Sequence, residues 1–453
     1  MEGIIWIKDL NKKKVREVGL KAAYLGELFN ENFNIPNGFV VSADSMKEFV
    51  YANNIKDDID SLLKKVNADD YNDLAETSEK IQQIILNEQI SPTLQNEILE
   101  AYENLNVSSE LRNTRVNVVN LIKSGRGNAI VSVRGSAVIE NLSFAGQQDS
   151  FLNVTGNKKL IEAVKRCWAS LYSPRAIVYI KNNNLKNVFS GVIVQRMIDS
   201  EKSGIAFSAN PIDNNRNEIL IEAGFGLGQA IVDGSVKPDI YVIDKNNLEL
   251  KHKIINKQKT KIIRDVNNNE TVRKKIFDDQ HKATLNSIDV HEIAKMAADA
   301  ENHYGRPVNI EFGIEKKPYL LQIRDITTLD KEIKIFDLKG EVALNGFGIS
   351  NGLGIGKVNV VRNAHSNFEN GDVLVAESLN VELLPLIKKA KGVVVNEGGC
   401  LSNMGILCRE LEVPVVVHEN ATSELRNGLI VSVDGYRGRV YRGEAKMKGI
   451  IDD

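Results

Sequence analysis

The first candidate site consists of Glu311, Gln322 and Arg324, on two short predicted strands that are separated by a polar EKK turn. In the segment VNIEFGI, strand alternation places Asn309 and Glu311 on one face, opposite the apolar residues. In YLLQIRD it places Gln322 and Arg324 together, opposite Leu321. Pairing of the strands brings a carboxylate and an amide oxygen together, and Mg²⁺ accepts both alongside phosphates and water. The neighbouring guanidinium suits a transferred phosphoryl group. Spacing alone equally allows a solvated hairpin face.

A second candidate is Arg134 in the strand-like segment VSVRG. Alternation places Ser132 and Arg134 on one face of this strand. Arginine suits phosphate because its planar fork donates parallel hydrogen bonds and keeps its charge, although a lone strand-end arginine is more often a surface ion pair. The following FAGQQDS segment contains Gly146 and Ser150. It is either a phosphate-covering loop or a simple turn, and the residues alone favour the turn.

The segment NEGGCLSNMGILCRELEVPVVV predicts a glycine turn that leads into a helix. Ser402 is the expected N-cap, and Ile406, Leu407 and Leu411 are expected to form the apolar stripe. Asn403 then lies in the first turn, where free N–H groups and the helix dipole favour negative charge. The alternative is an ordinary turn into a buried helix.

The elements around these residues predict an α+β protein. The chain from Gly19 to Ile98 is mostly helical in pattern, with a strand at residues 38–41, and from Val131 short β-like runs alternate with polar turns, which is typical of a largely antiparallel sheet. The C-terminal part is rich in Gly and Val and predicts a compact α/β domain. We predict a first domain at residues 1–330, a linker at 331–336 and a second domain at 337–453.

Composition excludes several classes of function. The 453 residues are 42% hydrophobic and 26% charged, with a formal net charge of −2, so no general attraction to nucleic acid or anionic membranes is expected. No run of residues predicts a signal peptide or a membrane span. The cysteines Cys167, Cys400 and Cys408 are too few and scattered for a disulfide framework. We therefore expect a cytoplasmic protein with a small-molecule site.

Taken in order, the motifs resemble the nucleotide-binding and phosphohistidine domains of phosphoenolpyruvate synthase, pyruvate phosphate dikinase and rifampicin phosphotransferase. The first domain carries the segments VGLKAAYLGEL, IPNGFVVS, VSVRGSAVIENLSFAGQQDSFLNV, SGVIVQRMI, SGIAFSANP, GFGLGQAIVDGSVKPD, ENHYGRPVNIEFGI and YLLQIRD. The second carries GDVLVAESLNVELLPLIKKAKGVVVNEGG, CRELEVPVVV and VDGYRGRVYRG. The resemblance implies an ATP-grasp-like N-terminal domain followed by a small swivelling β/α domain of phosphohistidine type.

The resemblance also implies a nucleotide site, with ATP and Mg²⁺ as cofactors. By matching position, Lys21 and Arg134 would hold nucleotide phosphates. Gly146 and Ser150 would belong to the covering loop, and Gln195 would lie in the strand that lines the adenine pocket.

The same resemblance gives the predicted hairpin a role. Glu311 and Gln322 would bind Mg²⁺, and Arg324 would contact the reacting phosphates. The positions implied for catalysis are Arg134, Arg324 and Asn403. The resemblance therefore favours a metal site over a solvated face as the interpretation of this hairpin.

The position of the family's phosphoryl-carrying histidine is Asn403 in this chain. A carboxamide nitrogen delocalises its lone pair into the carbonyl, so it is neither a useful nucleophile nor a phosphoryl carrier. The family usually has two alanines next, where this chain has Met404 and Gly405, which favours natural divergence over an engineered replacement. His418 replaces a usual glycine, and we do not expect it to substitute because it lies beyond a helix and a strand.

Two further departures weaken the negative field around a metal. Asn309 stands where aspartate is usual, and Gln229 stands where glutamate is usual. The length also leads us to expect neither a pyruvate-binding barrel nor an antibiotic-binding domain, so pyruvate is not assigned as the acceptor.

The sequence therefore predicts an ATP- and Mg²⁺-dependent phosphotransferase or ligase that acts on an unidentified small-molecule acceptor without a phosphohistidine relay. Three alternatives stay open. One is a catalytically degenerate nucleotide-binding regulatory or partner subunit. Another is one component of a split phosphotransferase, whose partner subunit supplies an acceptor or phosphohistidine domain. The third is an engineered His-to-Asn form of a phosphohistidine enzyme.

Overall fold

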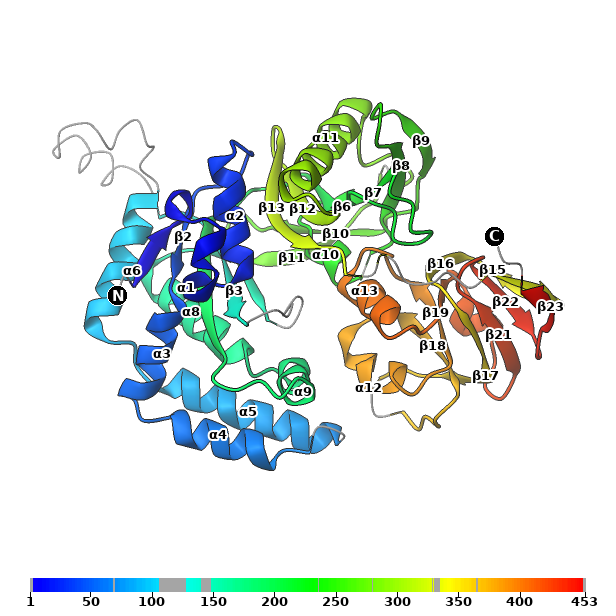
Figure 1. The fold of residues 1–453 in the computed structure, drawn as a ribbon, viewed down its shortest axis with the longest axis horizontal. Coiled ribbons are helices and arrows are strands. Elements are labelled where there is room, and N and C mark those ends of the chain that lie inside the picture. Colours follow the sequence, from blue (N-terminus) through cyan, green and yellow to red (C-terminus); the bar gives the residue numbers. More distant parts are fainter. Residues whose placement is uncertain are drawn as a thin grey trace. The chain divides into compact units, whose positions relative to one another are not determined.

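The computed structural model divides the chain into two units, which are described separately (Figure 1). Unit 1 comprises residues 1–198 and 264–271, and unit 2 comprises residues 199–263 and 272–453. The structure describes residues 3–67, 70–105, 128–139, 148–234, 236–278, 280–327, 329, 335–363 and 366–450. The linker predicted at 331–336 falls largely outside these residues, so the predicted domain boundaries stay a prediction. In the described part of the chain, no helix is long and apolar enough to cross a membrane.

Unit 1 is built on a five-stranded antiparallel sheet in the order β1-β2-β5-β3-β4. The strand predicted at residues 38–41 is β2. Helix α8 packs on β3, β4 and β5, and α3 packs on β5. The rings of Trp168 and Phe49, from these two helices, lie 5.0 Å apart between centroids in the buried core.

The strands of unit 1 are β1 Ile4–Trp6, β2 Gly38–Val41, β3 Val131–Val138, β4 Ser150–Val154 and β5 Phe189–Arg196. Its helices are η1 Ile7–Asp9, η2 Lys12–Lys14, α1 Val15–Val18, α2 Leu20–Asn30, α3 Ala43–Ala52, α4 Lys56–Lys65, α5 Tyr71–Asn87, α6 Pro92–Leu105, α8 Asn157–Ser170 and α9 Pro174–Asn182.

Unit 2 begins with a six-stranded antiparallel sheet in the order β13-β12-β6-β7-β8-β9, which α11 covers (Figure 1). Helix α11 starts at a capping box between Asn286 and Asp289, and it ends at Gly305, whose φ of 66° suits glycine. Ile293 and Ala297 of this helix have no exposed surface, and the helix packs on β6, β7, β12 and β13.

The elements of this part are β6 Lys202–Phe207, β7 Glu218–Phe225, α10 Gln229–Val232, β8 Asp239–Asp244, β9 Leu250–Ile254, α11 Ser287–Tyr304, β12 Val308–Ile314 and β13 Pro318–Asp325. A separate two-stranded sheet consists of β10 Thr260–Arg264 and β11 Thr271–Lys275.

The rest of unit 2 contains an eight-stranded sheet in the order β15-β22-β21-β17-β18-β19-β20-β16. Strands β17 to β20 are parallel neighbours, and their valine-rich sequences fit burial on both faces. One face of this sheet shares a core with β6, β7 and β8, because Phe207 and Leu220 belong to the same buried cluster as Leu374 and Val393.

The strands of this part are β14 Phe336–Lys339, β15 Val342–Asn345, β16 Phe347–Ser350, β17 Leu353–Val360, β18 Val373–Ser378, β19 Gly392–Glu397, β20 Val415–Val417, β21 Ile430–Asp434, β22 Arg439–Arg442 and β23 Lys446–Ile450. The helices are η3 Val381–Leu383, α12 Leu384–Ile387, α13 Asn403–Glu410 and α14 Ala421–Glu424. The predicted α+β organisation with antiparallel sheets in the N-terminal part is confirmed.

Candidate functional site

Lys21 lies in the first turn of α2 because the chain turns sharply at Gly19. Gly19 has a φ of 80°, and a Cβ there would meet the carbonyl oxygen of Ser136 at 2.2 Å, so only glycine allows this close approach to β3. The backbone N–H of Ala22 donates to Ser136 Oγ at 3.2 Å. Lys21 Nζ in turn donates to the carbonyl oxygen of Gly135 at 3.5 Å. The glycine turn therefore holds Lys21 beside the strand that carries Arg134.

The sheet of unit 1 brings Arg134, Ser150 and Gln195 together. Arg134 on β3 lies opposite Ser150 on β4, and Ser132 lies opposite Gln195 on β5. Arg134 donates to Gln195 Oε1, and Gln195 Nε2 donates to the carbonyl oxygen of Pro36 at 2.9 Å. Both side chains are buried, so the amide fixes the direction of the guanidinium. Gly146 lies outside the described residues.

The predicted pairing of the two strands near residue 310 is confirmed. Strand β12 pairs with β13 so that Glu311 lies opposite Gln322, and Gln322 Nε2 donates to Glu311 Oε1 at 2.7 Å. The expectation that Leu321 faces the core is wrong. A register shift after Glu311 makes Phe312 the partner of Leu320, which is fully buried, and leaves Leu321 partly exposed as the extra residue of a bulge.

Arg324 is held by both polar residues of the facing strand. Its Nε donates to Asn309 Oδ1 at 3.1 Å, and its Nη2 donates to Glu311 Oε1 at 3.3 Å. The hairpin face, defined as Asn309, Glu311, Gln322 and Arg324, is thus a connected polar group that contains one carboxylate and one guanidinium.

Asn403 reaches this hairpin face from a distant part of the sequence. Helix α13 starts at Asn403, and the N-cap Ser402 accepts from Gly405 N at 3.1 Å, as predicted. Arg324 Nη2 donates to Asn403 Oδ1 at 3.2 Å. The structure therefore brings together Glu311 on β12, Arg324 on β13 and Asn403 at the start of α13.

The predicted apolar stripe of α13 is confirmed only in part. Ile406 and Leu407 are half-buried against the core, but Leu411 is 36% exposed, and Cys408 and Arg409 are buried. Arg409 explains the difference, because its Nη1 donates to the carbonyl oxygens of Ile349 and Cys400 at 2.9 and 2.7 Å. Burial lowers the pKa of this guanidinium. These hydrogen bonds turn the Arg409 side of the helix inward, which hydrophobic spacing does not predict.

Sequence reasoning also missed a buried carboxylate on β7. Glu222 has no exposed surface, and its oxygens accept from Cys400 N at 2.8 Å and Leu401 N at 3.0 Å. The Cys400 thiol donates to the same carboxylate. Burial raises the pKa of Glu222, which these hydrogen bonds and Arg409 partly counteract. We call Glu222, Cys400, Leu401 and Arg409 the buried anchor. The available signal in the sequence was an acidic residue inside the apolar run EILIEAGF, which indicates a buried carboxylate.

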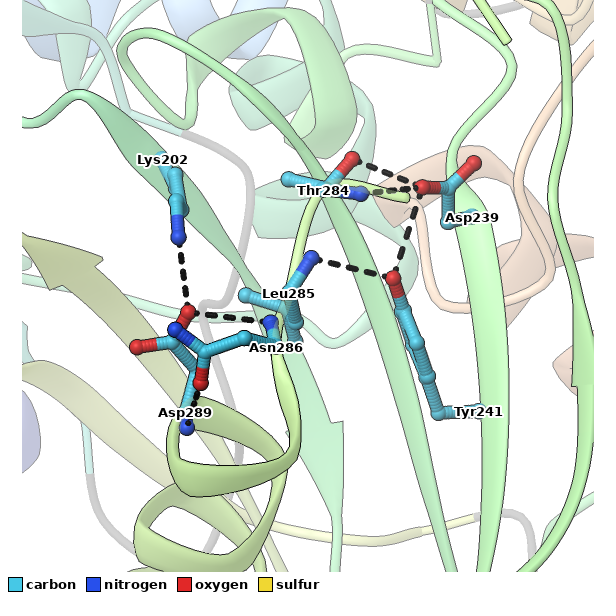
Figure 2. Close-up of polar contacts among 7 residues, drawn as sticks. All are labelled: Lys202, Asp239, Tyr241, Thr284, Leu285, Asn286 and Asp289. Atoms are coloured by element: carbon cyan, nitrogen blue, oxygen red, sulfur yellow. Dashed lines mark hydrogen bonds and ion pairs between the residues drawn. The ribbon is translucent and has the colours of Figure 1, made fainter. Parts of the chain in front are cut away.

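A second polar network fixes the start of α11 (Figure 2). Asp239 accepts from both the N–H and the hydroxyl of Thr284 at 2.8 Å, and the Tyr241 hydroxyl lies 3.4 Å from the same oxygen. Lys202 Nζ donates to Asp289 at 2.7 Å at the capping box. The network thus ties the segment before α11 to the sheet that contains β12. Asp239 and Tyr241 were not among the predicted site residues.

The described residues contain no group of three or more His, Cys, Asp or Glu side chains that could hold a metal ion alone. The hairpin face instead offers one carboxylate and one amide from facing residues, Glu311 and Gln322. Mg²⁺ is usually held by one or two carboxylates together with phosphates and water, so this donor set fits a metal that arrives with a nucleotide.

Family comparisons agree with this arrangement. Residues 15–337 match the model of the pyruvate phosphate dikinase AMP/ATP-binding domain, and residues 368–438 match that of the mobile domain of PEP-utilising enzymes. These domains define a protein with an AMP/ATP-binding domain followed by a mobile domain. The chain belongs to the phosphoenolpyruvate synthase and pyruvate phosphate dikinase family. The predicted fold class, an ATP-grasp-like N-terminal domain followed by a small swivelling β/α domain, is confirmed.

Individual relatives give the extent of the similarity. The chain is 36% identical to phosphoenolpyruvate synthase of Pyrococcus furiosus, over 98% of this chain and 59% of that protein. It is 35% identical to the probable phosphoenolpyruvate synthase of Archaeoglobus fulgidus, over 98% and 59% of the two chains. For the corresponding protein of Methanothermobacter thermautotrophicus the identity is 34%, over 97% and 63%. The chain thus spans about three fifths of the length of these relatives.

Proposed function

We propose that this chain is an ATP- and Mg²⁺-dependent phosphotransferase or ligase that passes a phosphoryl group directly to a small-molecule acceptor. The observation that carries the proposal is the hairpin face in contact with Asn403. Arg324 donates to both Glu311 and Asn403, so a phosphate-binding cation and a metal-binding carboxylate meet at the position of the family's carrier histidine.

Glu311 and Gln322 are the proposed magnesium ligands. Gln322 Nε2 donates to Glu311, which leaves the amide oxygen of Gln322 as a ligand beside the carboxylate. When bound, the ion would neutralise charge on the nucleotide phosphates. Arg324 would stabilise the negative charge of the transferred group, because its guanidinium donates several hydrogen bonds from a fixed plane.

In unit 1, Lys21 and Arg134 are the proposed ligands of nucleotide phosphates. Ser150, expected in the covering loop, is instead the first residue of β4, opposite Arg134. Gln195 would line the adenine pocket. Its contact with Arg134 supports this assignment, because a preoriented guanidinium loses less conformational freedom when phosphate binds. The first domain would comprise residues 1–330 and the second residues 337–453.

Asn403 is the basis for proposing direct transfer. The carboxamide accepts from Arg324 and cannot carry a phosphoryl group. In-line transfer needs mainly positioning and charge neutralisation, so an acceptor held beside Arg324 would replace the histidine. The acceptor is a small molecule, and the charge of the chain gives no reason to propose a nucleic acid or a membrane surface.

The contact between Arg324 and Asn403 also favours a second candidate. A nucleotide-binding regulatory or partner subunit would retain the phosphate ligands and lose only the carrier. In such a protein, the neutral amide of Asn403 would hold Arg324 in place without any transfer of phosphate. A split phosphotransferase, with the histidine on another chain, has the same arrangement.

Nucleotide turnover separates these functions. The protein is incubated with Mg²⁺ and γ-labelled ATP, with and without a metabolite extract, and AMP, ADP and phosphate are followed. We expect turnover that depends on the extract and falls at least about 100-fold in Glu311→Gln, with Glu315→Gln on the adjacent turn as the control. Intact ATP binding without turnover under any condition would reject the enzyme in favour of the regulatory subunit.

ATP affinity tests the phosphate ligands directly. Arg134→Ala is expected to weaken ATP binding at least about tenfold, because a charged hydrogen-bond donor to phosphate is lost. Arg196→Ala, an exposed arginine on β5, is the control. Unchanged ATP affinity in Arg134→Ala, measured by calorimetry, would show that the assignment is wrong.

A histidine at position 403 tests whether only the carrier has been lost. Asn403→His, incubated with ATP labelled at both the β- and the γ-phosphate, should retain labelled phosphate on the protein after denaturation in alkali, where phosphohistidine persists. A variant that binds ATP but retains no label would show that the transfer geometry has diverged as well.

A further inference from the structure

A cavity of about 360 Å³ lies within unit 2, apart from the hairpin face. One wall comes from β8, β9 and the segment before β8, and the other comes from β16 and the residues that follow β20. None of the predicted site residues lines it. Its volume is within the range of small-molecule sites.

The walls of this cavity combine polar residues with an apolar strip. Ile240 and Ile254 from the sheet face Phe347 and Val417 from the second part of the unit. Ile240 and Val417 are buried, whereas Ile254 and Phe347 are half-buried and provide the surface that a ligand would cover. Such a lining favours a ligand with an apolar or aromatic body.

Among the polar lining residues, Lys237 and His418 carry nitrogen donors that suit an anion. Lys237 is half-buried, and within the described part of the chain its ammonium group makes no hydrogen bond or ion pair. His418 Nδ1 accepts from Asn420 N at 3.3 Å, which places the proton of the neutral ring on Nε2. An ammonium and an imidazole N–H suit an anionic oxygen group.

Two carboxylates also line the cavity, and neither opposes this ligand strongly. Glu419 is exposed, so water and salt screen its charge. Glu222 is engaged by the N–H groups of Cys400 and Leu401. Among the charged residues of this lining that are at least half-buried, the group without a partner in the described part of the chain is therefore the ammonium of Lys237.

We propose that this cavity binds a small carboxylic acid with an apolar or aromatic body. The carboxylate would accept from Lys237 Nζ and His418 Nε2, and the body would lie against Ile254 and Phe347. Glu222 lines the cavity and also holds the turn before α13, so the bound acid would lie next to the segment that positions Asn403. The site is independent of the proposed phosphotransferase activity.

The probe is 3-phenylpropionate, and 3-phenylpropionamide is its uncharged counterpart. Binding to the full chain is measured by saturation-transfer NMR and titration calorimetry. We expect the acid to bind at millimolar concentration or better, and the amide to bind about tenfold more weakly because it lacks the charged hydrogen bond. No binding of the acid, or equal binding of the acid and the amide, would overturn the proposal.

Two variants locate the binding site. Lys237→Gln should weaken binding of the acid about tenfold, whereas Lys253→Gln, an exposed lysine on β9, should leave it unchanged. Ile254→Trp should block both probes by filling the cavity, and urea unfolding confirms that each variant is folded. If folded Lys237→Gln and Ile254→Trp bind the acid as the wild type does, the acid binds elsewhere and the proposal is wrong.

Discussion

The hairpin face and the buried anchor hold the two ends of the same short segment, residues 400–403, in different surroundings. The hairpin face reaches Asn403 through Arg324, which together with Glu311 retains some exposure to solvent. Within the buried anchor, Glu222 has no exposed surface and accepts from the N–H groups of Cys400 and Leu401. The two regions therefore hold adjacent residues at different cost in desolvation.

This difference separates a binding surface from a structural support. Arg324 and Glu311 form an ion pair whose side chains are 12% and 18% exposed, so it can rearrange around an incoming phosphate, and losing it should cost less stability than losing a fully buried charge pair. The Glu222 carboxylate is buried, so every N–H group that it accepts is needed to offset its desolvation. We expect substitutions in the first region to affect activity and substitutions in the second to affect stability.

The largest expected effect is on activity at the hairpin face. Arg324→Ala should lower nucleotide turnover about 1000-fold, because an arginine that stabilises a transferred phosphoryl group contributes this much or more. Its free energy of unfolding should stay close to that of wild type. Arg439→Ala, an exposed arginine on β22, is the control. A large loss of stability in Arg324→Ala would contradict the comparison.

Arg409→Met should have the largest effect on stability. The variant leaves the carbonyl oxygens of Ile349 and Cys400 without their donor and removes positive charge near Glu222. We expect the free energy of unfolding to fall by about 3 kcal/mol, as when one partner of a buried charged group is removed. Urea unfolding measures the free energy of unfolding of this variant and of Arg426→Met, the control at an exposed position. Equal free energies for the two variants would show that Arg409 does not stabilise the fold.

Glu222→Gln should lower stability by about 2 kcal/mol, because the amide keeps one acceptor oxygen and presents its NH2 group to the N–H donor of either Cys400 or Leu401. It should also change the pH dependence. The raised pKa of Glu222 means that the folded protein retains a proton that the unfolded chain has lost. The contribution of this carboxyl is therefore fully present below the ordinary glutamate pKa and is lost as pH rises through the raised pKa.

Urea unfolding across the acidic range tests this sign. Between the ordinary and the raised pKa, the wild type should lose stability relative to Glu222→Gln as pH rises. Glu292→Gln on the exposed side of α11 should follow the wild type. Parallel pH profiles for wild type and Glu222→Gln would show that the carboxyl does not titrate differently in the folded state.

Asn403→Ala should have the smallest effect, a change in the free energy of unfolding of about 1 kcal/mol or less. It removes one hydrogen bond of 3.2 Å to Arg324, in a region that keeps some contact with solvent. Urea unfolding under the conditions used for Glu222→Gln allows a direct comparison. If Asn403→Ala lost more free energy of unfolding than Glu222→Gln, the hairpin face rather than the buried anchor would be the structural support.

Much of the site followed from local sequence pattern. Alternation places Glu311 and Gln322 on one face once β12 and β13 pair, and the short turn between them makes that pairing the natural one. Ser402 caps α13 because a side-chain oxygen before a helix meets its free N–H groups. The bulge at Leu321 was not predictable, because one extra residue shifts the pattern without changing composition.

By itself, the sequence determined the α+β class, the hairpin and the resemblance that placed Asn403 at the carrier position, because these depend on residues close together in the chain or on ordered motifs. Only the tertiary structure decided that Arg324 contacts Asn403 and that Glu222 supports the turn before it. Those contacts join residues 79 and 179 positions apart. Burial and hydrogen-bond geometry, which assign opposite roles to two similar carboxylates, exist only once distant segments are packed together.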